Sequence, residues 1–378
     1  MILATFPLMI VVSRNLSIDV LRGLTIALMI VVNTPGNFSS TYSPFLHADW
    51  HGFTLTDWVF PTFLFVMGNA MSFGFAKMEA LGERAFLLKV MKRFLIIFLI
   101  GYFMFWFPFV KYNAEGDLIT KTFATTRIFG VLQRIALAYL LASLIIHYTK
   151  VSGALLISLL VLVGYRLILL AFGNLSLEGN AILKLDQWIL GEQHMFHGEG
   201  IAFDPEGILS TLPAVVNVIA GYCAAIFIIR RGFSYQTIAH LMVIGCVLIF
   251  MGLWWDLFFP INKKLWTSSY VIYTVGIDLM VLSVLIYIID LQKVAAWTYP
   301  FEVLGKNPLF IYVLSMVGVI LLFFFRVEDQ RLYHWIYQHW YQPMFGDYLG
   351  SFMFALSALA VCWGVAYLMD LKKIYIRI

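Results

Sequence analysis

The sequence predicts an all-α membrane protein, because it is apolar along its whole length and its apolar residues form long runs. Of its 378 residues, 62% are hydrophobic and only 12% are charged, against roughly 25% charged in soluble domains. About ten runs reach the roughly 20 residues that a helix needs to cross a hydrocarbon core of about 30 Å. Backbone groups must be paired internally in lipid, and these runs are too long for barrel strands. We therefore expect a polytopic bundle of about ten transmembrane helices, forming one integral domain over 1–378.

Each expected helix rests on one apolar run. The first is expected to end at Asn33, because Thr34-Pro35-Gly36 follows and proline cannot continue the helical hydrogen-bond ladder. The apolar residues 1–12 are expected to extend this helix, and only the connection at 173–207 approaches the size of a foldable unit. The predicted spans are 16–34, 55–76, 86–108, 127–148, 151–172, 208–229, 237–259, 266–289, 301–325 and 349–369.

The distribution of Lys and Arg predicts the orientation in the membrane. If the N-terminus is cytoplasmic, fourteen of the 25 Lys and Arg residues fall in inner connections and helix ends, against eight on the outer side. This excess predicts that both termini are cytoplasmic. Six of the eight histidines and the acidic connection 173–207 then lie on the outer side, which implies a polar outer vestibule.

The cysteines give no sign of a metal centre. Cys223, Cys246 and Cys362 lie in apolar runs without paired spacing, so we expect neither a disulfide framework nor a zinc site. No metal is expected in this protein.

Charged residues inside the expected spans are the next candidates for function, since a charge at a helix centre costs about 2.5–3.5 kcal/mol and usually faces a cavity. Arg22 follows Asp19 by three residues, so an ion pair at the helix end is the alternative to a binding role. Arg127 and Arg134 are seven apart and are expected on one helical face, where snorkelling or interhelical pairing is the alternative. Asp278 is either a paired or neutral carboxyl group or a proton-linked one.

The connection after the first span holds the densest group of reactive side chains. His47, Asp49, Trp50, His51 and Asp57 lie within eleven residues of one another. Histidine can act as a general base at neutral pH or carry an acyl group, and a neighbouring carboxylate can orient its imidazole. A hydrogen-bonded structural histidine is the alternative. Asn33, a short loop away, either caps its helix or donates to a developing oxyanion.

Blocks of sequence along the chain resemble the heparan-α-glucosaminide N-acetyltransferase family and its bacterial relatives. The first two are RNLSIDVLRGLTIALMIVVN at 14–33 and HADWHGFTLTDWVFP at 47–61. The later blocks are GVLQRIA at 130–136, FDPEGILSTLP at 203–213, PINKKLWTSSY at 260–270 and PFEVLGKN at 300–307. Together they span roughly 14–313 in the family's order.

The resemblance implies a multi-spanning enzyme that takes acetyl groups from cytosolic acetyl-CoA and delivers them to an amino sugar across the membrane. The family's catalytic histidine falls in the block of His47, and its functional asparagine aligns with Asn33. The loop between these residues is a few residues longer than in the animal branch, and Phe129 replaces a frequent proline. We therefore expect a smaller amino sugar or a cell-envelope glycan as acceptor, and a bacterial inner-membrane location.

The expected mechanism is N-acetyl transfer from acetyl-CoA as co-substrate. His47 is expected to deprotonate the amine or to accept the acetyl group, Asn33 to position the thioester or stabilise its oxyanion, and Asp49 or Asp57 to orient His47. The residues expected to bind the acceptor are Trp50, His51, Asp204 and Glu206. Those expected to bind the coenzyme phosphates, because Arg and Lys favour such groups, are Arg22, Gln133, Arg134, Asn262, Lys263 and Lys264.

Two alternative functions remain open on the sequence. The first is an amino-sugar transporter, in which the intramembrane charges and outer aromatic residues line a passage; the absence of inverted repeats counts against it. The second is O-acetylation of an envelope polysaccharide, with the same donor. Expected partners are the sugar or glycan acceptor, membrane lipids and a second copy of the chain, and no nucleic acid.

Overall fold

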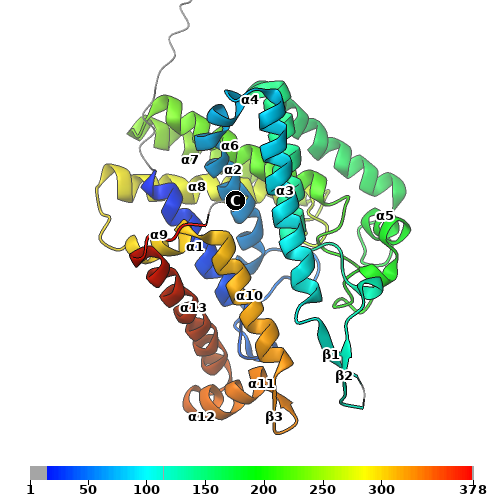
Figure 1. Ribbon diagram of the computed structural model, residues 1–378. Helices are drawn as coiled ribbons and strands as arrows, with labels where there is room; N and C mark the ends of the chain where they lie inside the picture. Colours follow the sequence, from blue (N-terminus) through cyan, green and yellow to red (C-terminus); the bar gives the residue numbers. More distant parts are fainter. Residues whose placement is uncertain (1–14, 114, 377–378) are drawn as a thin grey trace, which may run out of the picture.

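The computed structural model describes residues 15–113 and 115–376 (Figure 1). The expected extension of the first helix over 1–12 lies outside the described residues. Helices make up most of the described chain, and its strands form two short hairpins, β1 (Val110–Tyr112) with β2 (Leu118–Thr120) and β3 (Arg326–Val327) with β4 (Gln330–Arg331). The prediction of an all-α fold is confirmed.

Most of the helices begin or end near the predicted positions. Figure 1 shows α11, α12 and the hairpins at one end of the molecule, and the turn between α2 and α3 at the other. The α-helices are α1 (Leu16–Asn33), α2 (Leu55–Glu79), α3 (Glu83–Trp106), α4 (Val131–Phe172), α5 (Ala181–Leu190), α6 (Thr211–Arg231), α7 (Tyr235–Asp256), α8 (Ser268–Leu285), α9 (Tyr299–Lys306), α10 (Pro308–Phe324), α11 (Leu332–Ile336), α12 (Gln342–Phe345) and α13 (Asp347–Leu371).

The number of membrane-crossing helices differs from the predicted ten. Within the described residues, seven helices are long and apolar enough to cross a membrane, and the pair α9 and α10, bent by 85°, adds an eighth. Two of the predicted spans, 127–148 and 151–172, correspond to the two helices that make up the 42-residue element α4 and meet at a kink. Lys150 interrupts that element with φ 58°, and a straight helix of this length would extend about 63 Å, twice the hydrocarbon core. The predicted span 86–108 falls in α3, which carries Lys89, Lys92 and Arg93 and is not among the seven.

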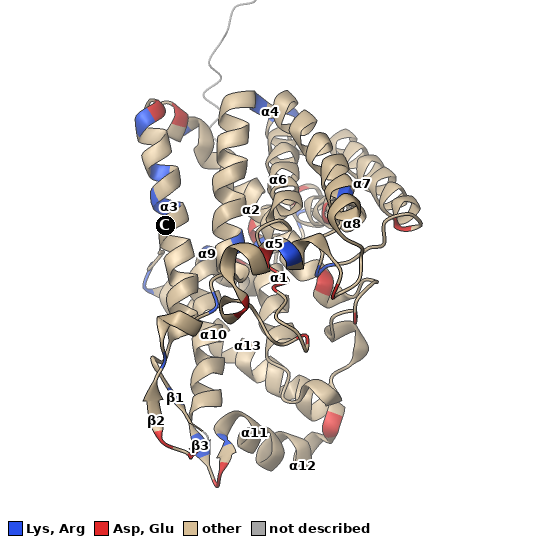
Figure 2. Cartoon of the chain, turned by 90° about the vertical axis from the view of Figure 1, so that its right-hand side faces the viewer, with Lys and Arg blue, Asp and Glu red and all other residues tan. Residues whose placement is uncertain are grey.

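Polar caps fix the starts of several helices. The Asn15 side chain accepts a hydrogen bond from the Ile18 amide at the start of α1, and Asn180 and Ser234 do the same for α5 and α7. In Figure 2 most of the helical ribbon is tan, so few residues of the helices are Lys, Arg, Asp or Glu, as expected for helices that face lipid.

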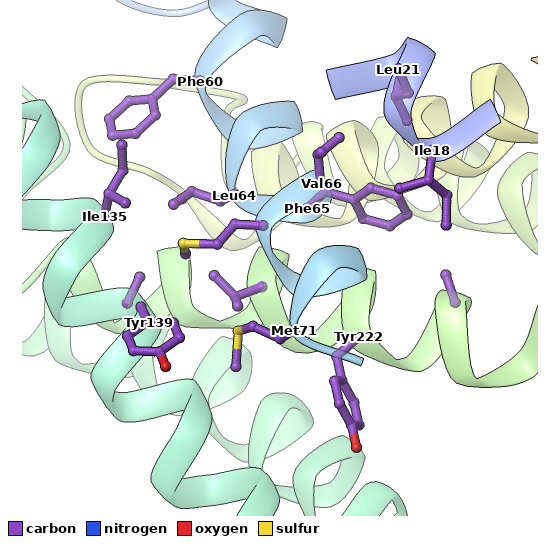
Figure 3. Close-up of a cluster of buried hydrophobic side chains, with 14 of the residues drawn as sticks. Ile18, Leu21, Phe60, Leu64, Phe65, Val66, Met71, Ile135, Tyr139 and Tyr222 are labelled. Atoms are coloured by element: carbon purple, nitrogen blue, oxygen red, sulfur yellow. The ribbon is translucent and has the colours of Figure 1, made fainter. Parts of the chain in front are cut away.

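Helix α2 lies at the centre of the main hydrophobic core. Figure 3 shows its side chains Phe60, Leu64 and Phe65 between residues of α1, α4 and α6. The backbones of α2 and α6 touch: a Cβ added to Gly68 would lie 1.9 Å from the Val218 carbonyl oxygen, and one added to Gly221 would lie 1.9 Å from the Phe65 carbonyl oxygen. Small residues allow such close approach between membrane helices.

Because of this contact, we expect a single methyl group added at Gly221 to destabilise the fold. We expect Gly221→Ala to lower the free energy of unfolding by about 1–3 kcal/mol, because the new Cβ meets backbone atoms of α2 that cannot move aside. The matched control is Gly364→Ala on α13, where nothing lies within 4 Å of the added atom. Thermal unfolding of the purified proteins in detergent measures both, and equal melting temperatures for the two variants would contradict the packing described here.

Candidate functional site

A capping box at the start of α2 holds a buried carboxylate in place. The Thr54 hydroxyl accepts from the Asp57 amide, and the Asp57 carboxylate accepts from the Thr54 amide at 3.1 Å. The same carboxylate accepts from the Ala48 amide at 3.1 Å and from the Thr54 hydroxyl at 3.0 Å. The Asp57 side chain is only 1% exposed, so its position is determined by these contacts.

His47 is the remaining partner of Asp57. Its Nδ1 lies 2.6 Å from Asp57 Oδ1, which assigns the ring proton to Nδ1 and leaves a lone pair on Nε2. The His47 side chain is 43% exposed, so Nε2 can be reached by a substrate. Burial by the surrounding protein and the Lys263 ammonium lower the pKa of His47 below its ordinary value, in spite of Asp57. The imidazole is therefore neutral near pH 7.

The segment between α7 and α8 covers this histidine. Lys263 Nζ lies 3.5 Å from His47 Nε2, and the Gly52 amide donates to the Ile261 carbonyl oxygen at 2.9 Å. Burial lowers the pKa of Lys263, and the Glu206 carboxylate acts against this effect. The Asn262 amide nitrogen lies 3.3 Å from His51 Nδ1, so two blocks more than 200 residues apart in sequence form one surface.

Arg127 and two carboxylates form a second charged cluster, in addition to that of Asp57, His47 and Lys263. Arg127 binds Asp204 through two hydrogen bonds, of 2.9 and 2.7 Å, and binds Glu206 Oε2 at 2.7 Å. Burial lowers the pKa of Arg127, but these carboxylates outweigh it and raise that pKa above its ordinary value. The Glu206 carboxylate also raises the pKa of His47 and that of Lys263 against the effect of burial, so the two groups form one electrostatic unit.

Gln133 and Arg134, at the start of α4, carry buried polar atoms without partners. Arg134 donates to Ser210 Oγ, and its guanidinium carbon lies 4.7 Å from the centre of the Trp266 ring. Within the described residues, Arg134 Nε and Nη1 and both polar atoms of the Gln133 side chain have no hydrogen-bond partner. Buried polar groups of this kind cost free energy unless they are paired, which marks this position for a polar ligand.

A cavity of about 420 Å³ lies between α1, α2, α3, α4 and α10. Its walls are mostly apolar, and Ile135, next to Arg134, is part of them. Three cations also line it: Arg22, Arg93 and Lys306. Arg22 is bound to Asp19 at 3.0 Å, Lys306 is paired with Asp370 at 2.6 Å, and Arg93 Nε has no hydrogen-bond partner among the described residues.

Comparison with known proteins bears directly on these residues. A family model described as "Heparan-alpha-glucosaminide N-acetyltransferase, catalytic" matches residues 14–186, which include His47, Asp57 and Arg134. The predicted resemblance to this family is confirmed. Heparan-alpha-glucosaminide N-acetyltransferase of Homo sapiens is 27% identical over 369 residues, covering 82% of this chain and 54% of the human protein. The Mus musculus protein of the same name is 26% identical over 368 residues, covering 80% and 53%. The chain thus spans about half the length of these relatives.

Several of the predicted site residues lie together. Asp57 is the predicted carboxylate that contacts His47. The Asp49 side chain is exposed, and the Asp49 carbonyl oxygen accepts from Lys264 Nζ at 2.9 Å. The other predicted residues near this histidine are His51, Asn262, Lys263 and Glu206.

Other predicted residues are held in different surroundings. Asn33 is the last residue of α1, and its exposed side chain makes no hydrogen bond to the side chains or loops of the described residues. Trp50 Nε1 donates to the Leu175 carbonyl oxygen at 2.7 Å, and its ring packs against Phe203. Lys264 is paired with Glu199 at 2.6 Å, and Arg22 lines the cavity between the helices.

Two predictions about individual charges need correction or refinement. Arg127 does not share a helical face with Arg134, because α4 begins at Val131 and Arg127 lies in the preceding connection. Asp278 is a hydrogen-bonded carboxyl group: its Oδ1 accepts from Trp58 Nε1 at 2.8 Å and from Thr62 Oγ1 at 2.7 Å. It therefore ties α8 to the first turns of α2, next to Asp57.

Arg93, Lys306 and Arg127 were not predicted as site residues from the sequence. Arg93 and Lys306 fall among the basic residues expected near helix ends, and only the tertiary arrangement of α3 and α9 around one cavity brings them together. A sequence signal existed for Lys306, which lies in the block PFEVLGKN of the resemblance.

Proposed function

We propose that this chain is a transmembrane acetyltransferase that moves an acetyl group from acetyl-CoA to the amine of an amino sugar or glycan. The observation that carries this proposal is the pair of His47 and Asp57, with Nδ1 bound to the carboxylate and Nε2 accessible. The named activity of the human and mouse relatives supports it. The bacterial inner membrane as its location and a homodimer as its assembly remain parts of the proposal.

The carboxylate gives the histidine its reactivity. Asp57 holds the Nδ1–H tautomer and stabilises the imidazolium that forms when Nε2 takes up a proton or an acyl group. As a base, Nε2 removes the amine proton while the amine attacks the thioester carbon and coenzyme A leaves as thiolate. As an acyl carrier, Nε2 attacks that carbon first and coenzyme A leaves as thiolate. The amine then attacks the acetyl carbon, the bond to Nε2 breaks, and the released imidazole takes up the amine proton.

The acceptor amine has a natural partner in Glu206. Asp204 uses both carboxylate oxygens to bind Arg127, whereas the hydrogen bonds of Glu206 to Arg127 use only Oε2. Glu206 Oε1 is thus the better candidate to receive an ammonium or hydroxyl group of the sugar, close to the charges of Lys263 and His47. Asp204 then serves to hold Arg127.

The donor fits the cavity of Arg22, Arg93 and Lys306. Its apolar walls suit the pantetheine arm, and the three cations suit the phosphates of the coenzyme. Gln133 and Arg134, with unpaired buried donors beside Ile135 of the cavity wall, are candidates for the amide or thioester oxygens. This assignment replaces the expected phosphate role of Asn262, Lys263 and Lys264, which contact the histidine segment instead.

A charge substitution in this cavity tests the donor assignment. We expect Arg93→Gln to raise KM for acetyl-CoA about tenfold or more with little change in kcat, because one charge-assisted hydrogen bond to phosphate is lost. Lys92→Gln is the matched control, since Lys92 is exposed and adjacent but does not line the cavity. Equal KM values for the two variants would remove the coenzyme from this cavity.

The pH profile tests the protonation state of His47. Activity requires the neutral imidazole, so it should fall on the acid side, at a pH below the ordinary histidine value of about 6.5. Lys263→Met removes a positive charge that lowers the pKa of His47, so its acid limb should move to higher pH. Lys111→Met, in the β1–β2 hairpin, should not change the pH at which activity falls on the acid side. If activity falls at the same pH in the unaltered chain and in both variants, this role of Lys263 is contradicted.

The functional class is tested with labelled acetyl-CoA and a panel of amino sugars. Purified protein in detergent should acetylate at least one amine of the panel. Uptake of labelled sugar into vesicles without acetylation would favour the transporter, and transfer to hydroxyl groups alone would favour O-acetylation of a polysaccharide.

A further inference from the structure

A second cavity lies away from the candidate site, between the part of α4 that follows Lys150 and helices α6, α7 and α8. It has a volume of about 540 Å³, within the range of sites that bind small molecules. Figure 1 shows α6, α7 and α8 as neighbouring helices on one side of the molecule. The apolar wall of this groove consists mainly of Leu155, Ala220, Cys223, Phe227, Ile244 and Leu248.

Two arginines stand at one end of this groove. Arg230 and Arg231 are the last residues of α6, which ends where Gly232 adopts φ 70°. Both line the groove, and neither forms an ion pair with another described residue. The guanidinium carbon of Arg231 lies 5.0 Å from the centre of the Phe227 ring, which holds this charge beside the apolar wall.

We propose that the groove binds an anionic phospholipid, with one acyl chain along the apolar wall and the phosphate between Arg230 and Arg231. Charge complementarity carries the choice of ligand: the two cations have no ion-pair partner among the described residues, and a planar guanidinium binds phosphate through paired hydrogen bonds. Basic pockets between membrane helices on the cytoplasmic side bind such headgroups, and the orientation expected from the basic residues puts this end of α6 on that side. The proposal is independent of acetyl transfer.

The test is lipid binding to the purified full chain, measured as lipid adducts by native mass spectrometry. Phosphatidylglycerol and phosphatidylcholine with the same acyl chains are compared. The double variant Arg230→Gln/Arg231→Gln should bind phosphatidylglycerol about 10–30-fold more weakly than the unaltered chain, since each basic residue contributes to anionic lipid binding. The control is Lys372→Gln/Lys373→Gln, two consecutive exposed cations just after α13 that do not line the groove; it should bind like the unaltered chain.

A second variant tests the apolar part of the site. Ala220→Phe adds a ring to the groove wall and should weaken phosphatidylglycerol binding with both arginines intact. The proposal would be overturned if the unaltered chain bound the two lipids equally, or if both double variants lost the same affinity for phosphatidylglycerol. It would also be overturned if a second copy of the chain, in place of lipid, covered the groove. Inorganic phosphate should not displace the lipid, since it lacks the acyl chain; displacement would also overturn it.

Discussion

His47→Gln is expected to reduce the rate of acetyl transfer by about 10²-fold or more. A general base accelerates the reaction by a factor of about 10²–10⁴, so a variant that has lost the base keeps a low but measurable activity. Loss of an acyl carrier leaves none, because the first bond cannot form. Glutamine keeps the approximate size of the side chain and can still accept or donate one hydrogen bond toward Asp57, so the fold should be retained.

The measurement is the initial rate of acetyl transfer at saturating acetyl-CoA, beside the melting temperature in detergent. His240→Gln is the matched control, since His240 is exposed on α7 and its Nδ1 contacts only the Gln236 carbonyl oxygen of its own helix. A rate for His47→Gln within a factor of two of the His240 variant would contradict a chemical role for His47.

Asp57→Asn is the second large effect. The amide cannot stabilise an imidazolium by charge, and the equivalent change in the serine-protease triad costs about 10⁴ in kcat. We expect a loss of about 10³-fold or more here, because Asp57 is buried and its contact to His47 is short. Asp49→Asn should keep most of the activity, since its side chain is exposed and does not contact His47.

The pH profile separates a positioning role of Asp57 from a purely structural one. The carboxylate raises the pKa of His47, so its removal should move the acid limb of the residual activity to lower pH, opposite to the shift expected for Lys263→Met. An unchanged limb together with a lowered melting temperature would mean that Asp57 acts only by capping α2.

Much of the fold follows from composition, because long apolar runs in lipid can only be helices. The predicted count of ten spans is not confirmed, because only tertiary structure shows how some of the apolar runs are divided into helices. The predicted boundary between 127–148 and 151–172 coincides with the break at Lys150, whereas α3 carries three cations, Lys89, Lys92 and Arg93, within its predicted span. The predicted span 301–325 ran through Asn307, where the structure bends by 85° between α9 and α10; Pro308 was a signal for a break that the prediction did not use.

Part of the candidate site could be predicted from the sequence, because one of its contacts is local. His47 and Asp57 lie ten residues apart, and the capping box makes their contact a local event at the start of α2. The contact of Lys263 with His47 joins residues 216 apart, and only tertiary packing decides it. The prediction that Arg127 and Arg134 share a helical face is wrong. Residues seven apart lie on one face only when both are in the same helix, and α4 begins after Arg127.

The most direct test of acetyl transfer across the membrane uses proteoliposomes with acetyl-CoA outside and the best amino-sugar acceptor of the panel inside. We predict that acetylated sugar accumulates inside vesicles with the unaltered chain, and that His47→Gln vesicles accumulate it at least about 10²-fold more slowly. Equal accumulation in both, or acetylation only when donor and acceptor share one side, would contradict acetyl transfer across the membrane through His47.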